Sequence, residues 1–152
     1  MTLLAQARTI LVVEDNAADA GLVAEAFEGT PRAPVVVTAT SGRAALARLR
    51  DRVAGPPPDV LLLDLNLPGY SGLQTLADLK ADAGLRRLPV IVLTTSKSQD
   101  EIDRCYEVGA AAVINKPLRL REYREMVGAF ERFWLGHVRF PERIWCQAQA
   151  PS

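Results

Sequence analysis

The sequence contains a single histidine and only two cysteines, and this shortage limits the chemistry open to it. Cys105 and Cys146 lie far apart, without CxxC spacing and without a nearby histidine, so they indicate neither a zinc site nor a disulfide scaffold. His137 lacks the sequence context of a kinase histidine, and we interpret it as a surface residue. The cysteine usage favours a reducing, cytoplasmic location.

An excess of charge of one sign and long apolar runs are also missing. Lys plus Arg and Asp plus Glu number 18 each, so the formal net charge is zero and no overall field attracts nucleic acid or an anionic membrane. Near the N-terminus, Arg8 interrupts the apolar residues, and the acidic pair Glu14 and Asp15 follows at once. We therefore expect no signal peptide, no membrane span and no nucleic-acid partner.

Five short apolar runs alternate with five amphipathic segments along the 152 residues. The runs cover 9–13, 35–39, 60–63, 89–93 and 111–115, and the helices are expected from Asn16, Ser41, Ser71, Ser98 and Leu120 onward. Such alternation with short connections predicts an α/β fold, a five-stranded parallel doubly wound sheet with five helices in a flavodoxin-like three-layer sandwich. All strand carboxyl ends then meet at one edge, where such sheets bind ligands.

The central run, V-L-L-L-D-L-N-L-P-G, delivers Asp64 to that edge. Its first four residues lack polar alternation, as expected for a strand covered on both faces, and Pro68-Gly69 ends it in a turn. An acid at the end of a buried strand is a candidate for chemistry. Taken alone, it is also compatible with an ordinary loop aspartate.

Three other strands end in polar groups that can converge on Asp64: Glu14 and Asp15 after the first, Thr94 after the fourth and Lys116 after the fifth. Carboxylates about 5 Å apart repel by roughly 3 kcal/mol per pair at an effective dielectric near 20, so the cluster requires a cation. Glu14, Asp15, Asp64 and a backbone carbonyl at Asn66 form an oxygen set suited to Mg²⁺ or Mn²⁺. Lys116 would balance the remaining negative charge.

These motifs together resemble the receiver domain of two-component response regulators, the chemotaxis-type phosphoacceptor fold, over roughly 9–133. The resemblance implies that a histidine kinase phosphorylates Asp64 and that Glu14, Asp15 and the Asn66 carbonyl hold Mg²⁺. It implies that Thr94 and Lys116 bind the phosphoryl oxygens. It further implies a phosphoacceptor with at most weak self-dephosphorylation, not an enzyme in the usual sense.

Two further expectations concern the fifth strand and the Lys-Pro pair that follows it. The resemblance implies a cis peptide between Lys116 and Pro117. The family often has an aromatic residue three positions before the lysine, but this chain has Val113 there. The usual coupled rotation of a threonine and an aromatic residue is therefore in doubt, and the output surface is expected to use another element.

The C-terminal stretch indicates a particular group within this family. Together with N-L-P-G-x-x-G and L-T-T-S, its F-W-L-G-H-V-R-F-P-E-R is similar to single-domain regulators that partner bacterial phytochrome histidine kinases. We expect a receiver domain over 1–136 and an extension over 137–152. The last helix and an arm from Phe130 to Trp145 are predicted to build a homodimer, because large apolar side chains need a packing partner.

Three other functions are weighed against this prediction. A flavodoxin-like ligand binder should offer backbone N–H groups and hydroxyls after the first strand, whereas E-D-N-A-A-D offers acids. A phosphatase using Asp64 as nucleophile would normally carry a second acid two residues on, and this chain has Asn66. A phosphorylation-independent scaffold would be expected to lose Asp64 or Lys116, and both are present.

Overall fold

The structure is a computed structural model that describes residues 7–142 except 52, 54 and 56. Its centre is one parallel sheet with strand order β2-β1-β3-β4-β5, which confirms the predicted fold class. The strands are β1 (Thr9–Val13), β2 (Val35–Ala39), β3 (Val60–Asp64), β4 (Val90–Thr94) and β5 (Ala112–Asn115).

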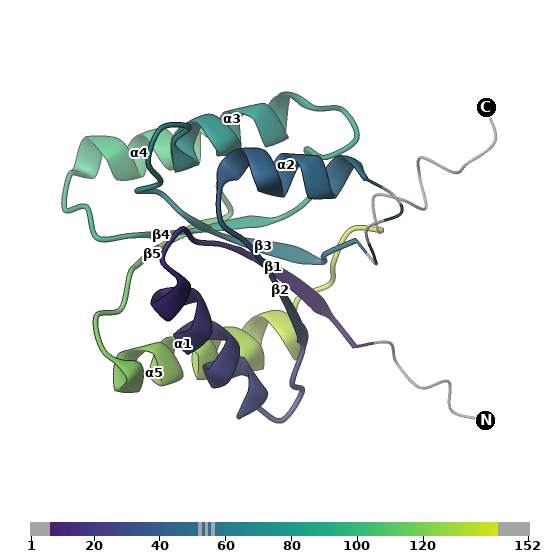
Figure 1. Cartoon of the computed structure of the whole chain (residues 1–152), viewed down its shortest axis with the longest axis vertical. Coiled ribbons are helices and arrows are strands. Elements are labelled where there is room, and N and C mark those ends of the chain that lie inside the picture. The colour runs from purple at the N-terminus through teal and green to yellow at the C-terminus, as the bar shows by residue number, and fades with distance from the viewer. Residues whose placement is uncertain (1–6, 52, 54, 56, 143–152) are drawn as a thin grey trace.

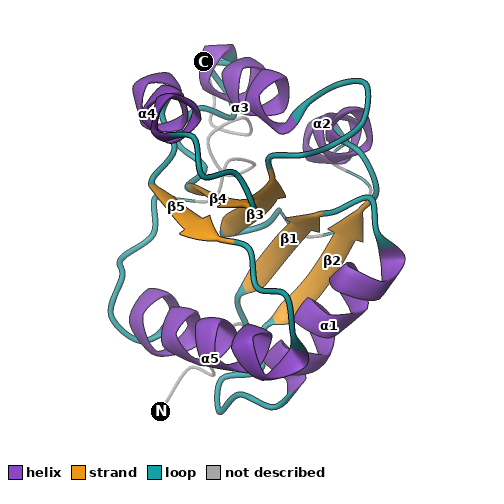
Figure 2. Cartoon of the chain, turned by 90° about the vertical axis from the view of Figure 1, so that its left-hand side faces the viewer, coloured by secondary structure: helices purple, strands orange, loops and turns teal. Residues whose placement is uncertain are grey.

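Five helices cover the two faces of this sheet. They are α1 (Ala17–Glu28), α2 (Gly42–Arg50), α3 (Gly72–Ala81), α4 (Gln99–Val108) and α5 (Leu120–Phe130). Figures 1 and 2 show α2, α3 and α4 on one face and α1 with α5 on the other. The expected N-caps at Asn16, Ser41, Ser71 and Ser98 all accept backbone N–H groups, so local sequence sets where these four helices begin.

The apolar runs of β1, β3 and β4 are buried on both faces, as their continuous hydrophobicity predicts. Because successive strand side chains point to opposite faces, Leu61 and Leu63 pack under α2, α3 and α4, whereas Leu62 packs with α1 and α5. The sheet is thus the middle of three layers. Its rigid strands hold the residues at their carboxyl ends in a defined arrangement.

The turn after β3 is packed tightly against the start of α3. Gly72 donates its backbone N–H to the Leu65 carbonyl at 3.1 Å. A Cβ at Gly72 would lie 2.6 Å from Leu65 Cα and closer still to the Asp64 carbonyl oxygen. Glycine therefore allows the helix to begin directly beneath the residue that ends the central strand.

The last helix begins at Leu120 as expected, but it does not stay α-helical as far as the apolar residue Phe133. It ends at Phe130 and passes into a π-helical turn, Glu131–Leu135. The wider turn inserts an extra residue per turn and rotates the following side chains, so Phe133 leaves the buried face and is 59% exposed. Trp134 instead stacks on Phe130, with ring centroids 5.9 Å apart.

The described part of the predicted arm lies on its own domain. Phe140 packs against Trp134 at a centroid distance of 6.2 Å, and the Arg8 guanidinium lies 4.7 Å from the Phe140 ring centroid. Arg8 also pairs with the buried Asp59 at 3.3 Å. These contacts give Trp134 and Phe140 an intramolecular packing partner. Trp145, the far end of the predicted arm, lies outside the described residues.

Within the described part of the chain, no helix combines the length and the apolar character needed to cross a membrane.

Candidate functional site

Asp64 ends β3 at the carboxyl edge of the sheet, and its residue is only 3% exposed. One carboxylate oxygen, Oδ1, accepts the backbone N–H of Asn66 at 3.0 Å. The other, Oδ2, accepts a hydrogen bond from Lys116 Nζ at 3.1 Å. The carboxylate is therefore held in one orientation from both sides, which suits a nucleophile that must meet an incoming group in line.

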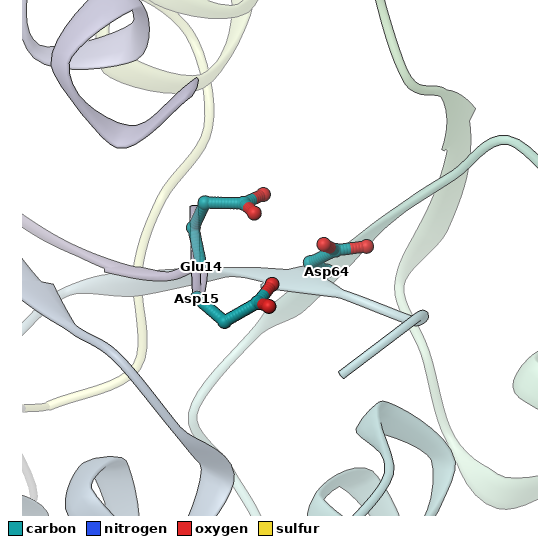
Figure 3. Close-up of side chains that lie close together, drawn as sticks. All are labelled: Glu14, Asp15 and Asp64. Atoms are coloured by element: carbon teal, nitrogen blue, oxygen red, sulfur yellow. The ribbon is translucent and has the colours of Figure 1, made fainter. Parts of the chain in front are cut away.

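Glu14 and Asp15 stand beside Asp64, as Figure 3 shows. One carboxylate oxygen from each of the three residues lies within 4.8 Å of the others. Three anionic oxygen donors this close are mutually repulsive without positive charge, and hard oxygen ligands are those that divalent cations such as Mg²⁺ and Mn²⁺ prefer. The donor set therefore fits a divalent metal site.

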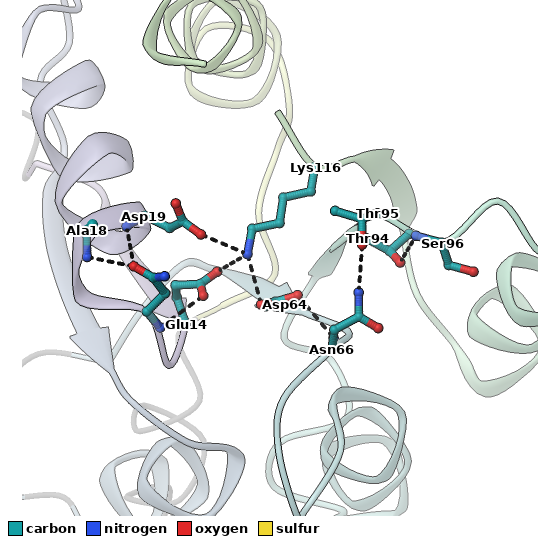
Figure 4. A network of polar contacts seen from close by, with 10 residues as sticks. Glu14, Ala18, Asp19, Asp64, Asn66, Thr94, Thr95, Ser96 and Lys116 are labelled. Carbon is teal, nitrogen blue, oxygen red and sulfur yellow. Dashed lines mark hydrogen bonds and ion pairs between the residues drawn. The ribbon is translucent and has the colours of Figure 1, made fainter. Parts of the chain in front are cut away.

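Lys116 follows β5 and supplies a positive charge to this edge (Figure 4). Its Nζ lies 2.8 Å from Glu14 Oε2 and 3.1 Å from Asp64 Oδ2. A third carboxylate, Asp19 Oδ2 on the first turn of α1, lies 3.2 Å away. Burial disfavours the charged form of Lys116, but the hydrogen bonds from its ammonium to Glu14 and Asp64 outweigh this effect and raise its pKa.

The Glu14 side chain is almost as deeply buried as that of Asp64, and much more so than that of Asp19. Burial raises the pKa of the Glu14 carboxyl, and hydrogen bonds from Lys116 and from the backbone N–H of Asn16 offset part of that increase. The negative charge of Asp64 raises this pKa further. A cation bound at the cluster would favour the ionised form of Glu14.

A second, smaller network borders Asp64 on the β4 side. The Asn66 side-chain amide donates to Thr95 Oγ1 at 3.1 Å, and the Ser96 backbone N–H donates to Thr94 Oγ1 at 2.9 Å. Thr94 is fully buried and pairs in register with Asn115, next to Lys116. The Thr94 hydroxyl thus lies at the same edge as Asp64, but it accepts its hydrogen bond from the loop between β4 and α4.

The structure therefore brings together Glu14, Asp15, Asp64 and Lys116 and places Thr94 on the adjacent strand. The Asn66 backbone carbonyl as a metal ligand stays a prediction. Sequence analysis missed Asp19 as a partner of Lys116. The available signal was an acid in the first turn of the helix that follows β1, three residues after the N-cap Asn16.

The expected cis peptide between Lys116 and Pro117 is wrong, because no cis peptide bond occurs among the described residues, which include both. For a bond preceding proline, trans is intrinsically favoured by about 0.5–1 kcal/mol, and only tertiary contacts can reverse that preference.

Tyr123 on α5 lies close enough to this network to be affected by it. Burial raises the pKa of its phenol from about 10 to about 12, with a further contribution from Asp19 that Lys116 partly offsets. The folded state therefore binds the phenolic proton more tightly, so this contribution to stability is complete below pH 10 and is lost as pH rises toward 12.

We expect the free energy of unfolding of the wild type to fall by about 2–3 kcal/mol more than that of Tyr123→Phe between about pH 9 and pH 12. Urea unfolding at several pH values measures this difference. Parallel curves for the two proteins would show that the phenol titrates alike in the folded and unfolded states.

A parallel sheet of order 2-1-3-4-5 with an acid cluster and a lysine at its carboxyl edge defines a phosphoacceptor of two-component signalling. The chain belongs to the response regulator receiver domain family, whose profile matches residues 10–128. Receiver domains accept a phosphoryl group on an aspartate and partner with sensor histidine kinases. This result confirms the family that the sequence motifs predicted.

Comparison with known proteins finds response regulators that are similar to this chain over most of its length. Response regulator Rcp1 of Synechocystis sp. is 36% identical over 88% of this chain and 93% of its own length. The structure of its Mn²⁺-bound form superposes with a TM-score of 0.80, covering 88% of this chain and 99% of that one.

Two further solved structures extend this group. The phosphorylated cyanobacterial phytochrome response regulator RcpA is 38% identical, with a TM-score of 0.83 over 90% of this chain and all of that one. The bacteriophytochrome response regulator AtBRR is 35% identical, with a TM-score of 0.65 over 82% of this chain and 94% of that one. The chain thus resembles phytochrome-associated regulators over most of its length.

Proposed function

We propose that Asp64 is the residue that accepts the phosphoryl group. The observation that carries this proposal is the position of its carboxylate, buried at a strand end and bonded to Lys116 within a cluster of three acids. An Asp64 oxygen attacks phosphorus and forms a P–O bond while the P–N bond to the donor histidine breaks. The product is an acyl phosphate on Asp64.

The surrounding residues position the reactants. The Asn66 N–H holds Oδ1, so Oδ2 is the oxygen presented beside Lys116. Lys116 neutralises charge that develops on the phosphoryl oxygens, and Thr94 can reach the product by side-chain rotation. We assign Mg²⁺ to the carboxylates of Glu14, Asp15 and Asp64 and the Asn66 carbonyl, where it would supply positive charge against the phosphoryl oxygens.

Intact mass measurement tests the acceptor function. The protein is incubated with Mg²⁺ and acetyl phosphate, and we expect a single phosphoryl adduct that fails to form when EDTA replaces the metal. Absence of an adduct under both conditions would favour the scaffold alternative. We propose no further enzymatic activity beyond weak self-dephosphorylation, and decay of the adduct after donor removal measures it.

The roles assigned to Asp15 and Lys116 have opposite consequences for metal binding. Asp15→Asn removes a ligand charge and is expected to weaken Mg²⁺ binding by roughly tenfold or more. Lys116→Met removes a cation that contacts Glu14 and Asp64, so binding is expected to be equal or tighter. Calorimetry measures both, because Trp134 lies away from the cluster and its fluorescence need not respond. Equal weakening by both substitutions would contradict the role of Lys116.

We further propose that the donor is a phytochrome-type histidine kinase. This proposal is supported by the similarity to RcpA, a cyanobacterial phytochrome response regulator, and to AtBRR, a bacteriophytochrome response regulator. Phosphotransfer from a panel of autophosphorylated sensor kinases tests it. We expect transfer from phytochrome kinases to be faster than from kinases of other input classes. The cytoplasmic location stays a prediction.

A homodimer also remains a proposal, with 137–152 as an extension of the receiver domain. Removing the arm by truncation is not a suitable test of the homodimer. Truncation after Glu131 would remove Trp134 and Phe140, which pack against the domain's own core, so loss of folding would be confused with loss of pairing. Phe133 is the better target, because it is exposed next to Trp134.

We expect Phe133→Ser to raise the dimer dissociation constant by at least about 100-fold. A two-fold interface buries two copies of the side chain, each contributing about 1.5–3 kcal/mol. Light scattering at tens of micromolar measures the mass, with Val35→Ser as the control, since Val35 is an exposed apolar residue on the β2 edge. A monomeric wild type would exclude the dimer.

A further inference from the structure

The Lys116 ammonium is shared among three carboxylates that do not have the same role (Figure 4). Two of them, Glu14 and Asp64, belong to the acid cluster that fits a divalent cation. The third, Asp19, lies 3.2 Å from Nζ and is not a member of that cluster. The ammonium therefore bridges the candidate metal ligands and one acid outside them.

This arrangement creates a competition between two cations. Nζ is only 2.8 Å from Glu14 Oε2 and 3.1 Å from Asp64 Oδ2, which are carboxylates that a divalent ion at the cluster would use. A divalent ion bonded to the same groups would stand close to the ammonium, and like charges in a partly buried site repel strongly. We therefore expect the ammonium to move away from these oxygens when a metal ion binds.

Asp19 is placed to receive it. Its backbone N–H donates to the Asn16 side chain at 3.1 Å, so the first turn of α1 is capped and Asp19 is held at a defined position. Its side chain is 32% exposed, compared with 4% for Glu14, so an ion pair with Asp19 is closer to water than the pair with Glu14. The ammonium can shift toward Asp19 without losing a charged partner.

We propose that Asp19 is a positioning residue for Lys116, which holds the ammonium at the margin of the acid cluster while a divalent cation occupies it. The inference rests on the proposed metal and phosphoacceptor roles of this site. Asp19 thereby lowers the cost of metal binding and keeps Lys116 within reach of an arriving phosphoryl group. Asp19 is not among the residues on which the resemblance to the family rests.

A double-mutant cycle on Mg²⁺ binding isolates the effect. Calorimetric titration with Mg²⁺ alone is carried out on the wild type, Asp19→Asn, Lys116→Met and the double variant, in about 0.5 M KCl so that the longer-range field of Asp19 is screened. We expect Asp19→Asn to weaken Mg²⁺ binding roughly three- to fivefold when Lys116 is present and to have little effect when Lys116 is absent.

Glu25→Gln is the matched control. It removes one carboxylate from the same helix, where Glu25 pairs with Arg124 at 3.9 Å instead of Lys116, and we expect it to leave Mg²⁺ binding unchanged. Loss of favourable charge at the helix start would affect both backgrounds alike and cancel in the cycle.

Equal weakening in both backgrounds would overturn the proposal, because Asp19 would then act only through its charge. Unchanged or tighter binding in Asp19→Asn would also overturn it. If the wild type binds no Mg²⁺, the metal assignment fails together with this inference. If the wild type binds Mg²⁺ and accepts phosphate but the cycle shows no coupling, only the role of Asp19 fails.

Discussion

Asp64→Asn is expected to abolish phosphorylation by acetyl phosphate. The substitution preserves the size of the side chain, and the amide oxygen can still accept a hydrogen bond from Lys116, but the nucleophilic carboxylate is gone. A loss of at least 10³-fold, on the order of the effects seen when covalent nucleophiles are removed, corresponds to about 4 kcal/mol in the barrier. Intact mass spectra taken over time measure the remaining rate.

The control for this result is Asp59→Asn. Asp59 is another buried aspartate, but it lies at the opposite end of β3, where it accepts the backbone N–H of Thr9 at 2.9 Å and pairs with Arg8. We expect this variant to be less stable and still to acquire one phosphoryl group. An adduct that persists at the wild-type rate in Asp64→Asn would show that another residue is the acceptor.

Gly72→Ala is expected to destabilise the fold by about 3 kcal/mol and to slow phosphorylation. The new Cβ would lie 2.6 Å from Leu65 Cα, and backbone cannot move aside as a flexible side chain can. Relief of the clash must displace either the start of α3 or the chain just after Asp64. Because Asn66 N–H orients the Asp64 carboxylate, that displacement reaches the acceptor directly.

Urea unfolding and the rate of adduct formation measure the two effects of Gly72→Ala. Gly21→Ala is the matched control, because no atom lies within 4 Å of the position that its Cβ would take on α1. There the substitution is expected to stabilise the protein by up to about 1 kcal/mol through helix propensity. If both variants had the same stability as the wild type, the packing assigned to Gly72 would be wrong.

The residues of the site were predictable from sequence because each belongs to a local pattern. A buried strand reads as a continuous apolar run, and the polar residue that ends it marks the carboxyl edge, which is how Asp64 and the pair Glu14 and Asp15 stand out. The four helix caps are equally local, because a capping side chain bonds backbone groups two or three residues on.

Features that depend on contacts between distant residues could not be predicted from local sequence patterns. The π-helical turn after Phe130 and the return of Phe140 onto Arg8 depend on how α5 packs against α1 and the sheet. Helical periodicity continues through Phe133 in the sequence and gives no sign of the π-helical turn. The trans bond before Pro117 likewise depends on tertiary context.

The sequence by itself determined the fold class, the order of strands and helices, and the set of acids at the sheet edge, because hydrophobic periodicity and capping act over a few residues. Only the tertiary structure decided which acids share the Lys116 ammonium. Lys116 and Glu14 are 102 positions apart in the sequence. Asp19 lies next to Lys116 because it is in the first turn of α1, which begins shortly after β1 ends. Ion pairs form between neighbours in space, and that proximity exists only once the parallel sheet has brought the strand ends together.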